Sequence, residues 1–158
     1  MISVLFVCLG NICRSPAAEG VLRQLVEKVG KKDEFLIQSC GIGDWHLGQL
    51  PDERMRHSAE SRGVILASRA QKFLREFYES FDYIFAVDHE VLNVLYQHAK
   101  TPEQKAKIHL ITAYSPSYRN QEVPDPYYSG EGEFELVLDI IEDSCEGFIE
   151  YLTQHHKI

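Results

Sequence analysis

The stretch Cys8-Leu9-Gly10-Asn11-Ile12-Cys13-Arg14-Ser15 joins a short apolar run to a helical pattern, and it decides the fold. The run before it, residues 2–7, ends at a Gly-Asn turn signal and is typical of a buried strand in a parallel sheet. After it, apolar residues recur at helical spacing over residues 17–29, with Ser15 as a candidate N-cap and Pro16 at the first helical position. The loop therefore joins a strand to the start of a helix, where backbone N–H groups converge and favour an anion.

The side chains of this loop indicate which anion it binds. The Arg14 guanidinium can donate to two oxygens of a phosphate at once, a geometry that lysine lacks. We expect Cys8, near that guanidinium and a helix N-terminus, to be a thiolate at neutral pH that can attack phosphorus. The Ser15 hydroxyl could donate a hydrogen bond to the sulfur. The remaining phosphate contacts would come from the loop residues Leu9, Gly10, Asn11, Ile12 and Cys13.

The spacing of this octet, a Cys, five residues and then Arg-Ser, is the signature of cysteine-dependent phosphatases. For a lone Cys, a buried core residue is the better explanation, but the whole octet between a strand and a helix disfavours it. With Leu-Gly-Asn-Ile-Cys in the gap and the motif near the N-terminus, the chain resembles the low-molecular-weight protein tyrosine phosphatases. The resemblance covers essentially the whole chain. It implies hydrolysis of phosphotyrosine through a phosphocysteine intermediate, with no cofactor.

Asp125, between Pro124 and Pro126, is the candidate general acid. The oxygen expelled from phosphorus needs a proton, and no group of the octet can supply one. A bare Asp-Pro pair is usually only a turn signal. However, Asp125-Pro126-Tyr127-Tyr128 resembles the acid loop of the family, which implies that Asp125 protonates the leaving oxygen and then activates water. General acid catalysis of this kind contributes about 10²–10⁴-fold.

Three aromatic residues are candidates for the substrate cleft: Trp45, Tyr127 and Tyr128. Trp45, the only tryptophan, lies in a glycine-rich loop after a predicted strand and could be either a hydrophobic plug or a wall of the pocket. The resemblance favours the wall. Trp45 and Tyr127 could then enclose a flat ring, so that phosphotyrosine is preferred over phosphoserine. Tyr127 and Tyr128 are also positions that are phosphorylated in some relatives.

The resemblance implies that Asn11, Ser15 and Ser39 hold the shape of the loop through buried hydrogen bonds. The sequence departs from the family at Ser68, where many members carry a histidine in that network. Because serine is shorter, the rigidity of the loop is in question. At the end of a later strand, Asp88 is expected to cap the helix that carries Val91.

The four cysteines allow two further hypotheses. Cys13 is five residues from Cys8 and could form a regulatory disulfide with it, or could simply be a small buried hydrophobe. An arsenate reductase on the same fold would need two further cysteines to shuttle a disulfide. Cys40 and Cys145 are far apart in the sequence, and Cys145 lies on the apolar stripe of a helix, which disfavours this alternative. A non-catalytic phosphate-binding module is the third possibility.

The remaining elements predict an α/β fold. Strands are expected over residues 2–7, 35–39, 83–87 and 108–111, alternating with helices, which indicates a four-stranded parallel sheet with helices on both faces, a Rossmann-like or flavodoxin-like three-layer arrangement. Residues 1–158 are expected to form a single phosphatase domain. The sequence further predicts helices over 51–63, 70–82 and 134–152, a charged connector over 100–107 and a long aromatic loop over 113–132.

The composition limits the partners. With 44% apolar residues and 25% charged residues, the chain is of the ordinary globular class. A net charge of −8 argues against nucleic acid and anionic membranes, although local donors can still bind an anionic substrate. The cysteines and histidines lack metal-ligand spacing, and the N-terminus lacks a basic leader. We therefore expect no metal, a cytoplasmic location, phosphotyrosine proteins or small aryl phosphates as substrates, and inorganic phosphate as a product inhibitor.

Overall fold

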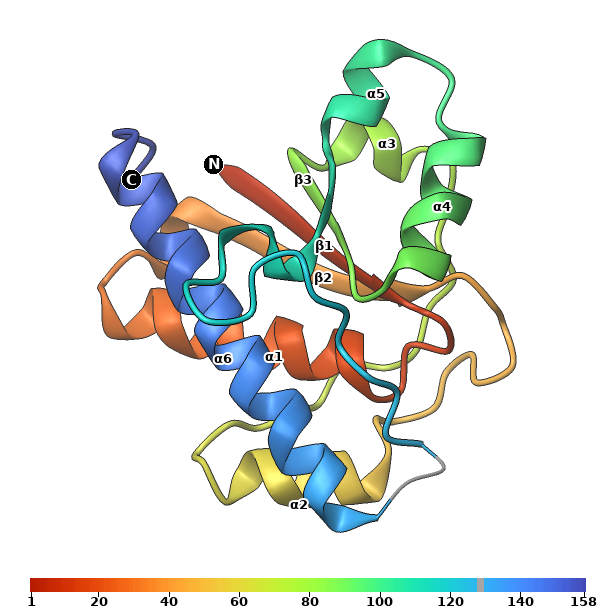
Figure 1. Ribbon diagram of the computed structural model, residues 1–158, viewed down its shortest axis with the longest axis vertical. Coiled ribbons are helices and arrows are strands. Elements are labelled where there is room, and N and C mark those ends of the chain that lie inside the picture. The colour runs from red at the N-terminus through yellow and green to blue at the C-terminus, as the bar shows by residue number, and fades with distance from the viewer. Residues whose placement is uncertain (128–129) are drawn as a thin grey trace.

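The computed structural model describes residues 1–127 and 130–158. In these residues the strands β1 (Ile2–Cys8), β2 (Phe35–Gly41), β3 (Tyr83–Ala86) and β4 (Ile108–Leu110) form one parallel sheet (Figure 1). The strand order is β2-β1-β3-β4. This confirms the predicted four-stranded parallel sheet.

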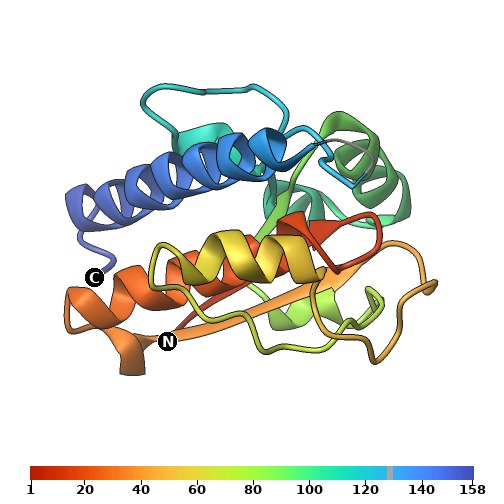
Figure 2. The ribbon, with the colours of Figure 1, turned by 90° about the horizontal axis from the view of Figure 1, so that it is seen from below.

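Helices cover both faces of the sheet, which confirms the three-layer α/β fold (Figures 1 and 2). One face carries the two longest helices, with a shorter one packed outside them: α1 (Arg14–Lys28), α6 (Glu131–Gln154) and α2 (Glu53–Glu60). The other face carries α3 (Phe77–Ser80), α4 (His89–His98) and α5 (Pro102–Ala106). Two 3-10 turns, η1 (Lys32–Glu34) and η2 (Ile111–Tyr114), complete the elements. No helix of the described residues is long and apolar enough to span a bilayer.

Strand β1 lies at the centre of the core. It pairs with β2 on one side and β3 on the other, and its residues from Val4 to Val7 are almost fully buried. Because both faces of this strand are covered, its sequence is a continuous apolar run rather than an alternating one. The run ends at Cys8, at the carboxyl edge where ligands bind in open α/β sheets.

The helix predicted over residues 70–82 is wrong for most of its length. Only Phe77–Ser80 is helical, and the segment before it is extended beside the end of β2. There Gly41 donates to the carbonyl of Gln71 at 2.8 Å and accepts from the N–H of Phe73 at 2.8 Å. These bonds occupy backbone groups that a helix would need, so pairing with the sheet outweighs the helical spacing of the aromatic residues.

Two smaller predictions also need correction. Helix α1 begins at Arg14, with Cys13 at the N-cap, so Ser15 is inside the helix and does not cap it. The charged connector contains the short helix α5, which Thr101 caps by accepting from the N–H of Gln104 at 3.1 Å. The start of α1 differs from the prediction by one or two residues, and α5 is too short to show a helical period.

Candidate active site

The loop after β1 is folded tightly against the end of β2. The carbonyls of Cys8 and Leu9 accept from the N–H groups of Ile42 and Gly43 at 3.0 and 2.9 Å. Asn11 has a positive φ of 56°, in the left-handed region that asparagine tolerates. At Gly41 a Cβ atom would lie 2.9 Å from the carbonyl oxygen of Leu9, so only glycine permits this close approach.

The Cys8 sulfur lies at the centre of this loop and is almost fully buried. Its Sγ is 2.9 Å from the Ser15 hydroxyl and accepts from the N–H of Asn11 at 3.2 Å. The Asn11 side-chain amide donates to the Ser15 oxygen at 2.8 Å, so the Ser15 proton is free to point at the sulfur or, at 3.3 Å, at the carbonyl of Cys40. Two donors, the N–H of Asn11 and the Ser15 hydroxyl, can therefore point at the sulfur.

Asn11 is the hub of a buried network that supports the loop. Its amide also donates to the Ser39 hydroxyl at 3.0 Å, which in turn donates to Glu19 at 2.5 Å. Glu19 is buried and forms an ion pair with Arg23 at 2.8 Å. The structure thus brings together the three predicted supporting residues and adds Glu19, whose position on the apolar side of a helix was not singled out in the sequence.

The supporting role expected near Ser68 is filled by Gln71. Its backbone N–H donates to the side-chain oxygen of Asn11 at 2.9 Å, and its side chain donates to the carbonyl of Ser39 at 2.9 Å. The partly buried Ser68 makes no hydrogen bond within residues 1–127 and 130–158. The rigidity of the loop therefore depends on the extended segment that pairs with Gly41 rather than on residue 68.

The Arg14 side chain is 4% exposed and is held in place by two hydrogen bonds. Its Nη1 donates to Asp88 at 2.8 Å and to the carbonyl of Val123 at 2.9 Å. Burial alone would lower the pKa of Arg14, but the neighbouring Cys8 sulfur and Asp88 carboxylate raise it overall, so the guanidinium stays charged. With Nη1 engaged, Nε and Nη2 remain as donors for an anion, and Nη2 also lies 3.6 Å from the Asp125 carboxylate.

Asp88 has two roles. Its Oδ1 accepts from the N–H of Val91 at 2.9 Å, which confirms the predicted helix cap, and its Oδ2 pairs with Arg14. The second contact was missed in the sequence analysis. The feature of the sequence that could have indicated this contact is the position of Asp88 at the end of a strand, on the same edge of the sheet as Cys8.

Asp125 reaches the same site from the segment between η2 and α6. Its Oδ2 lies 3.6 Å from Arg14 Nη2, and its Oδ1 accepts from the N–H of Tyr127 at 3.0 Å. The side chain is 44% exposed, so it can exchange protons with water. The structure therefore brings Cys8, Arg14 and Asp125, residues up to 117 positions apart, into one pocket.

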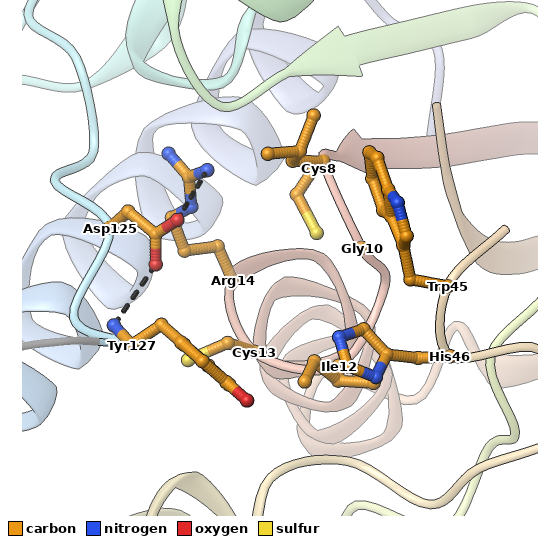
Figure 3. A pocket seen from close by; sticks show the side chains of 10 residues that line it. Cys8, Gly10, Ile12, Cys13, Arg14, Trp45, His46, Asp125 and Tyr127 are labelled. Atoms are coloured by element: carbon orange, nitrogen blue, oxygen red, sulfur yellow. Dashed lines mark hydrogen bonds and ion pairs between the residues drawn. The ribbon is translucent and has the colours of Figure 1, made fainter. Parts of the chain in front are cut away.

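The pocket has a volume of about 430 Å³, and aromatic side chains form its rim (Figure 3). Figure 3 shows Trp45 and His46 on one side of the Cys8 sulfur and Asp125 and Tyr127 on the other. Trp45 is 64% exposed and lines this pocket, so it is not a core plug, and its role as a wall for the substrate stays a prediction. Tyr128 lies outside the described residues. The pocket is lined by Cys8, Leu9, Gly10, Ile12, Cys13, Arg14, Trp45, His46, Asp125 and Tyr127.

His46 is the pocket residue that the sequence analysis missed. Its ring lies against Gly10, where a Cβ atom would be 3.0 Å from His46 Cδ2, and its centroid is 6.3 Å from that of Tyr127. Its Nδ1 is 3.1 Å from the Gln49 side-chain oxygen. The adjacent Trp45 was the only available signal, since nothing in the spacing of the histidines marks this one.

Cys13 also lines the pocket, but its thiol is buried. Burial and the nearby Cys8, Asp52 and Asp125 raise the pKa of Cys13, so its thiol stays protonated at neutral pH. The four cysteines are all free. A disulfide between Cys8 and Cys13 remains a prediction.

The fold and this pocket define a class: an α/β protein in which the turn from the first strand to the first helix gathers a thiol, a guanidinium and backbone N–H groups. Residues 3–157 match the family model described as low molecular weight phosphotyrosine protein phosphatase. The chain belongs to this family.

Similar proteins agree with this assignment. A low molecular weight phosphotyrosine protein phosphatase of Schizosaccharomyces pombe is 42% identical over 96% of this chain and 97% of its own length. The crystal structure of a protein tyrosine phosphatase from Entamoeba histolytica matches with a TM-score of 0.93 and 37% identity, covering both chains completely. A Drosophila structure described as an arginine phosphatase matches with a TM-score of 0.87 and 34% identity over 98% of each chain.

Proposed function

We propose that this protein hydrolyses phosphotyrosine esters through a phosphocysteine intermediate. The observation that carries the proposal is that the Cys8 sulfur, the Arg14 guanidinium and the Asp125 carboxylate all face one aromatic-rimmed pocket. Nucleophile, phosphate clamp and proton donor are the three functions that cleavage of a phosphate monoester requires.

In the first step the Cys8 thiolate attacks phosphorus in line with the ester oxygen. The S–P bond forms as the P–O bond to the tyrosine ring breaks. The Arg14 donors that face the pocket and the loop N–H groups hold the equatorial oxygens. The phenolic oxygen leaves with a proton from Asp125.

In the second step water attacks the phosphocysteine. Asp125, now a carboxylate, takes a proton from the water as the new P–O bond forms and the S–P bond breaks. The Ser15 hydroxyl, 2.9 Å from the sulfur, stabilises the thiolate that departs. Inorganic phosphate is the product, and because it fits the same donors it should inhibit competitively.

A substrate panel tests the proposed specificity. We expect kcat/KM for a phosphotyrosyl peptide to exceed that for the matched phosphoseryl peptide by about 10- to 200-fold, the range that filling an apolar pocket provides. Released phosphate is the measurement. Since a similar Drosophila protein is described as an arginine phosphatase, a phosphoarginyl peptide belongs in the panel. Preference for phosphoarginine or phosphoserine would contradict the proposed specificity for phosphotyrosine.

The buried cysteines disfavour the arsenate reductase alternative. Cys40 and Cys145 are 0% and 2% exposed, and burial raises the pKa of both thiols. A disulfide relay needs accessible thiolates, so neither residue suits that role. Arsenate-dependent oxidation of thioredoxin is therefore expected to be absent.

The proposed role of Trp45 as a wall of the pocket provides a second test, because the indole of Trp45 lies against Gly43. A Cβ atom at Gly43 would lie 1.8 Å from Trp45 Cζ3, so Gly43→Ala must displace the indole. We expect KM for p-nitrophenyl phosphate to rise about 2- to 10-fold, the value of one aromatic contact, with kcat and phosphate inhibition unchanged. The matched control is Gly43→Ala combined with Trp45→Ala, which should behave like Trp45→Ala alone. A further rise in KM in the double variant would contradict the role given to the indole.

A further inference from the structure

We propose that Arg54 is a positioning residue for the general acid: it fixes the segment Pro124–Tyr127, here called the acid loop, over the phosphate-binding loop. The inference rests on the proposed function, because it assumes that Asp125 donates the proton. It adds a residue that does not line the pocket.

Arg54 contacts the acid loop directly. It is the second residue of α2, and its Nη2 donates to the carbonyl of Tyr127 at 2.9 Å. Its guanidinium also lies over two rings, 5.6 Å from the centroid of Tyr127 and 4.8 Å from that of Phe134 in the first turns of α6. Arg54 therefore binds the chain on both sides of the connection between the acid loop and α6.

Arg54 is in turn fixed to the phosphate-binding loop. Its Nε and Nη2 donate to the two oxygens of Asp52 at 3.1 and 3.0 Å. The backbone N–H of Asp52 donates to the carbonyl of Ile12 at 2.6 Å. Burial would raise the pKa of Asp52, but the bonds from Arg54 hold it below its ordinary value, so the pair stays ionised. A continuous path of bonds thus joins Ile12 to Tyr127.

The hydrogen bond from Arg54 to the Tyr127 carbonyl lies close enough to Asp125 in the chain to affect the placement of its side chain. The Asp125 side chain is 44% exposed, so its placement depends on the backbone around it. The carbonyls two residues before and two residues after it, those of Val123 and Tyr127, each accept from an arginine, Arg14 and Arg54 respectively. Arg14 also faces the substrate, whereas Arg54 does not, so Arg54 can be changed without removing a phosphate contact.

The contact should affect catalysis more than stability. Exposed ion pairs contribute little to the stability of a fold. A displacement of the proton donor by about an ångström, by contrast, should lower the rate strongly, because proton transfer requires hydrogen-bond distance. Loss of Arg54 should therefore reduce the benefit from Asp125 while the fold and the nucleophile remain.

The test compares two substrates that differ in their need for an acid. In Arg54→Ala we expect kcat/KM for phenyl phosphate, which reports the step in which the ester oxygen leaves, to fall about 10-fold, part of the 10²–10⁴-fold that a general acid provides. For p-nitrophenyl phosphate, whose leaving oxygen is far less basic, kcat/KM should fall less than about 3-fold. Adding Arg54→Ala to Asp125→Ala should cause no further loss for either substrate.

Two further variants serve as controls. Arg56→Ala removes a charge from the same helix, but Arg56 donates to the carbonyl of Pro51 and not to the acid loop, so both substrates should be unaffected. Arg54→Lys keeps the charge without the planar fork and should give an intermediate loss for phenyl phosphate. An equal loss for both substrates in Arg54→Ala, or an additive loss with Asp125→Ala, would overturn the inference. An inactive wild-type protein would instead refute the proposed function.

Discussion

Replacing Cys8 with serine is expected to lower turnover of p-nitrophenyl phosphate by roughly 10⁴- to 10⁶-fold, as loss of a catalytic nucleophile does elsewhere. The substitution changes one atom at a site where Ser15 Oγ and the N–H of Asn11 lie 2.9 and 3.2 Å from the sulfur. A serine hydroxyl there should stay protonated at neutral pH, since in residues 1–127 and 130–158 the polar contacts of the Cys8 sulfur are the Ser15 hydroxyl and the N–H of Asn11, and neither is a base. Steady-state release of p-nitrophenol measures the effect.

Phosphate binding provides the control for this variant. The Arg14 side chain and the loop N–H groups remain in Cys8→Ser, so saturating inorganic phosphate should still raise the thermal midpoint by several degrees. Unchanged turnover in Cys8→Ser would exclude Cys8 as the nucleophile. A wild-type protein that phosphate stabilises but that turns over no ester would be the non-catalytic binding module.

The strand, loop and helix at the N-terminus could be predicted because their signals are local. The apolar run over residues 2–7 is visible in the sequence itself, and the octet carries the proposed nucleophile and phosphate clamp within eight residues. The parallel sheet followed from the alternation of strands and helices. The role of Asp125 was predicted through the family resemblance, since an Asp between two prolines does not indicate a general acid until the fold places it beside Arg14.

The contacts that were missed join residues far apart in the chain. Asp88 is 74 positions from Arg14, and Arg54 is 73 positions from Tyr127. Gln71 shows the same limit: its neighbours have helical spacing, but its backbone pairs with Gly41 and Asn11 across the end of the sheet. A periodic pattern reports which face of a segment is apolar, but not which loop lies against it.

Asp125→Ala is the second change for which we expect a large effect. We expect kcat/KM for phenyl phosphate to fall by about 10²–10⁴-fold, because the phenoxide would have to leave without a proton. The loss of kcat/KM for p-nitrophenyl phosphate should be much smaller, so the dependence of kcat/KM on the basicity of the leaving group should become steeper. The side chain is 44% exposed, and so the stability of the fold should change by no more than about 0.5 kcal/mol.

Asp125→Asn separates the proton from the shape of the side chain. Asparagine can keep the hydrogen bond from the N–H of Tyr127, 3.0 Å in the native protein, but it cannot donate a proton to the leaving oxygen as an acid. We therefore expect Asp125→Asn to match Asp125→Ala on both substrates. If asparagine restored most of the activity on phenyl phosphate, the role of residue 125 would be to hold the acid loop. The proton would then have to come from another donor at the pocket, and His46 is one of the residues that line it.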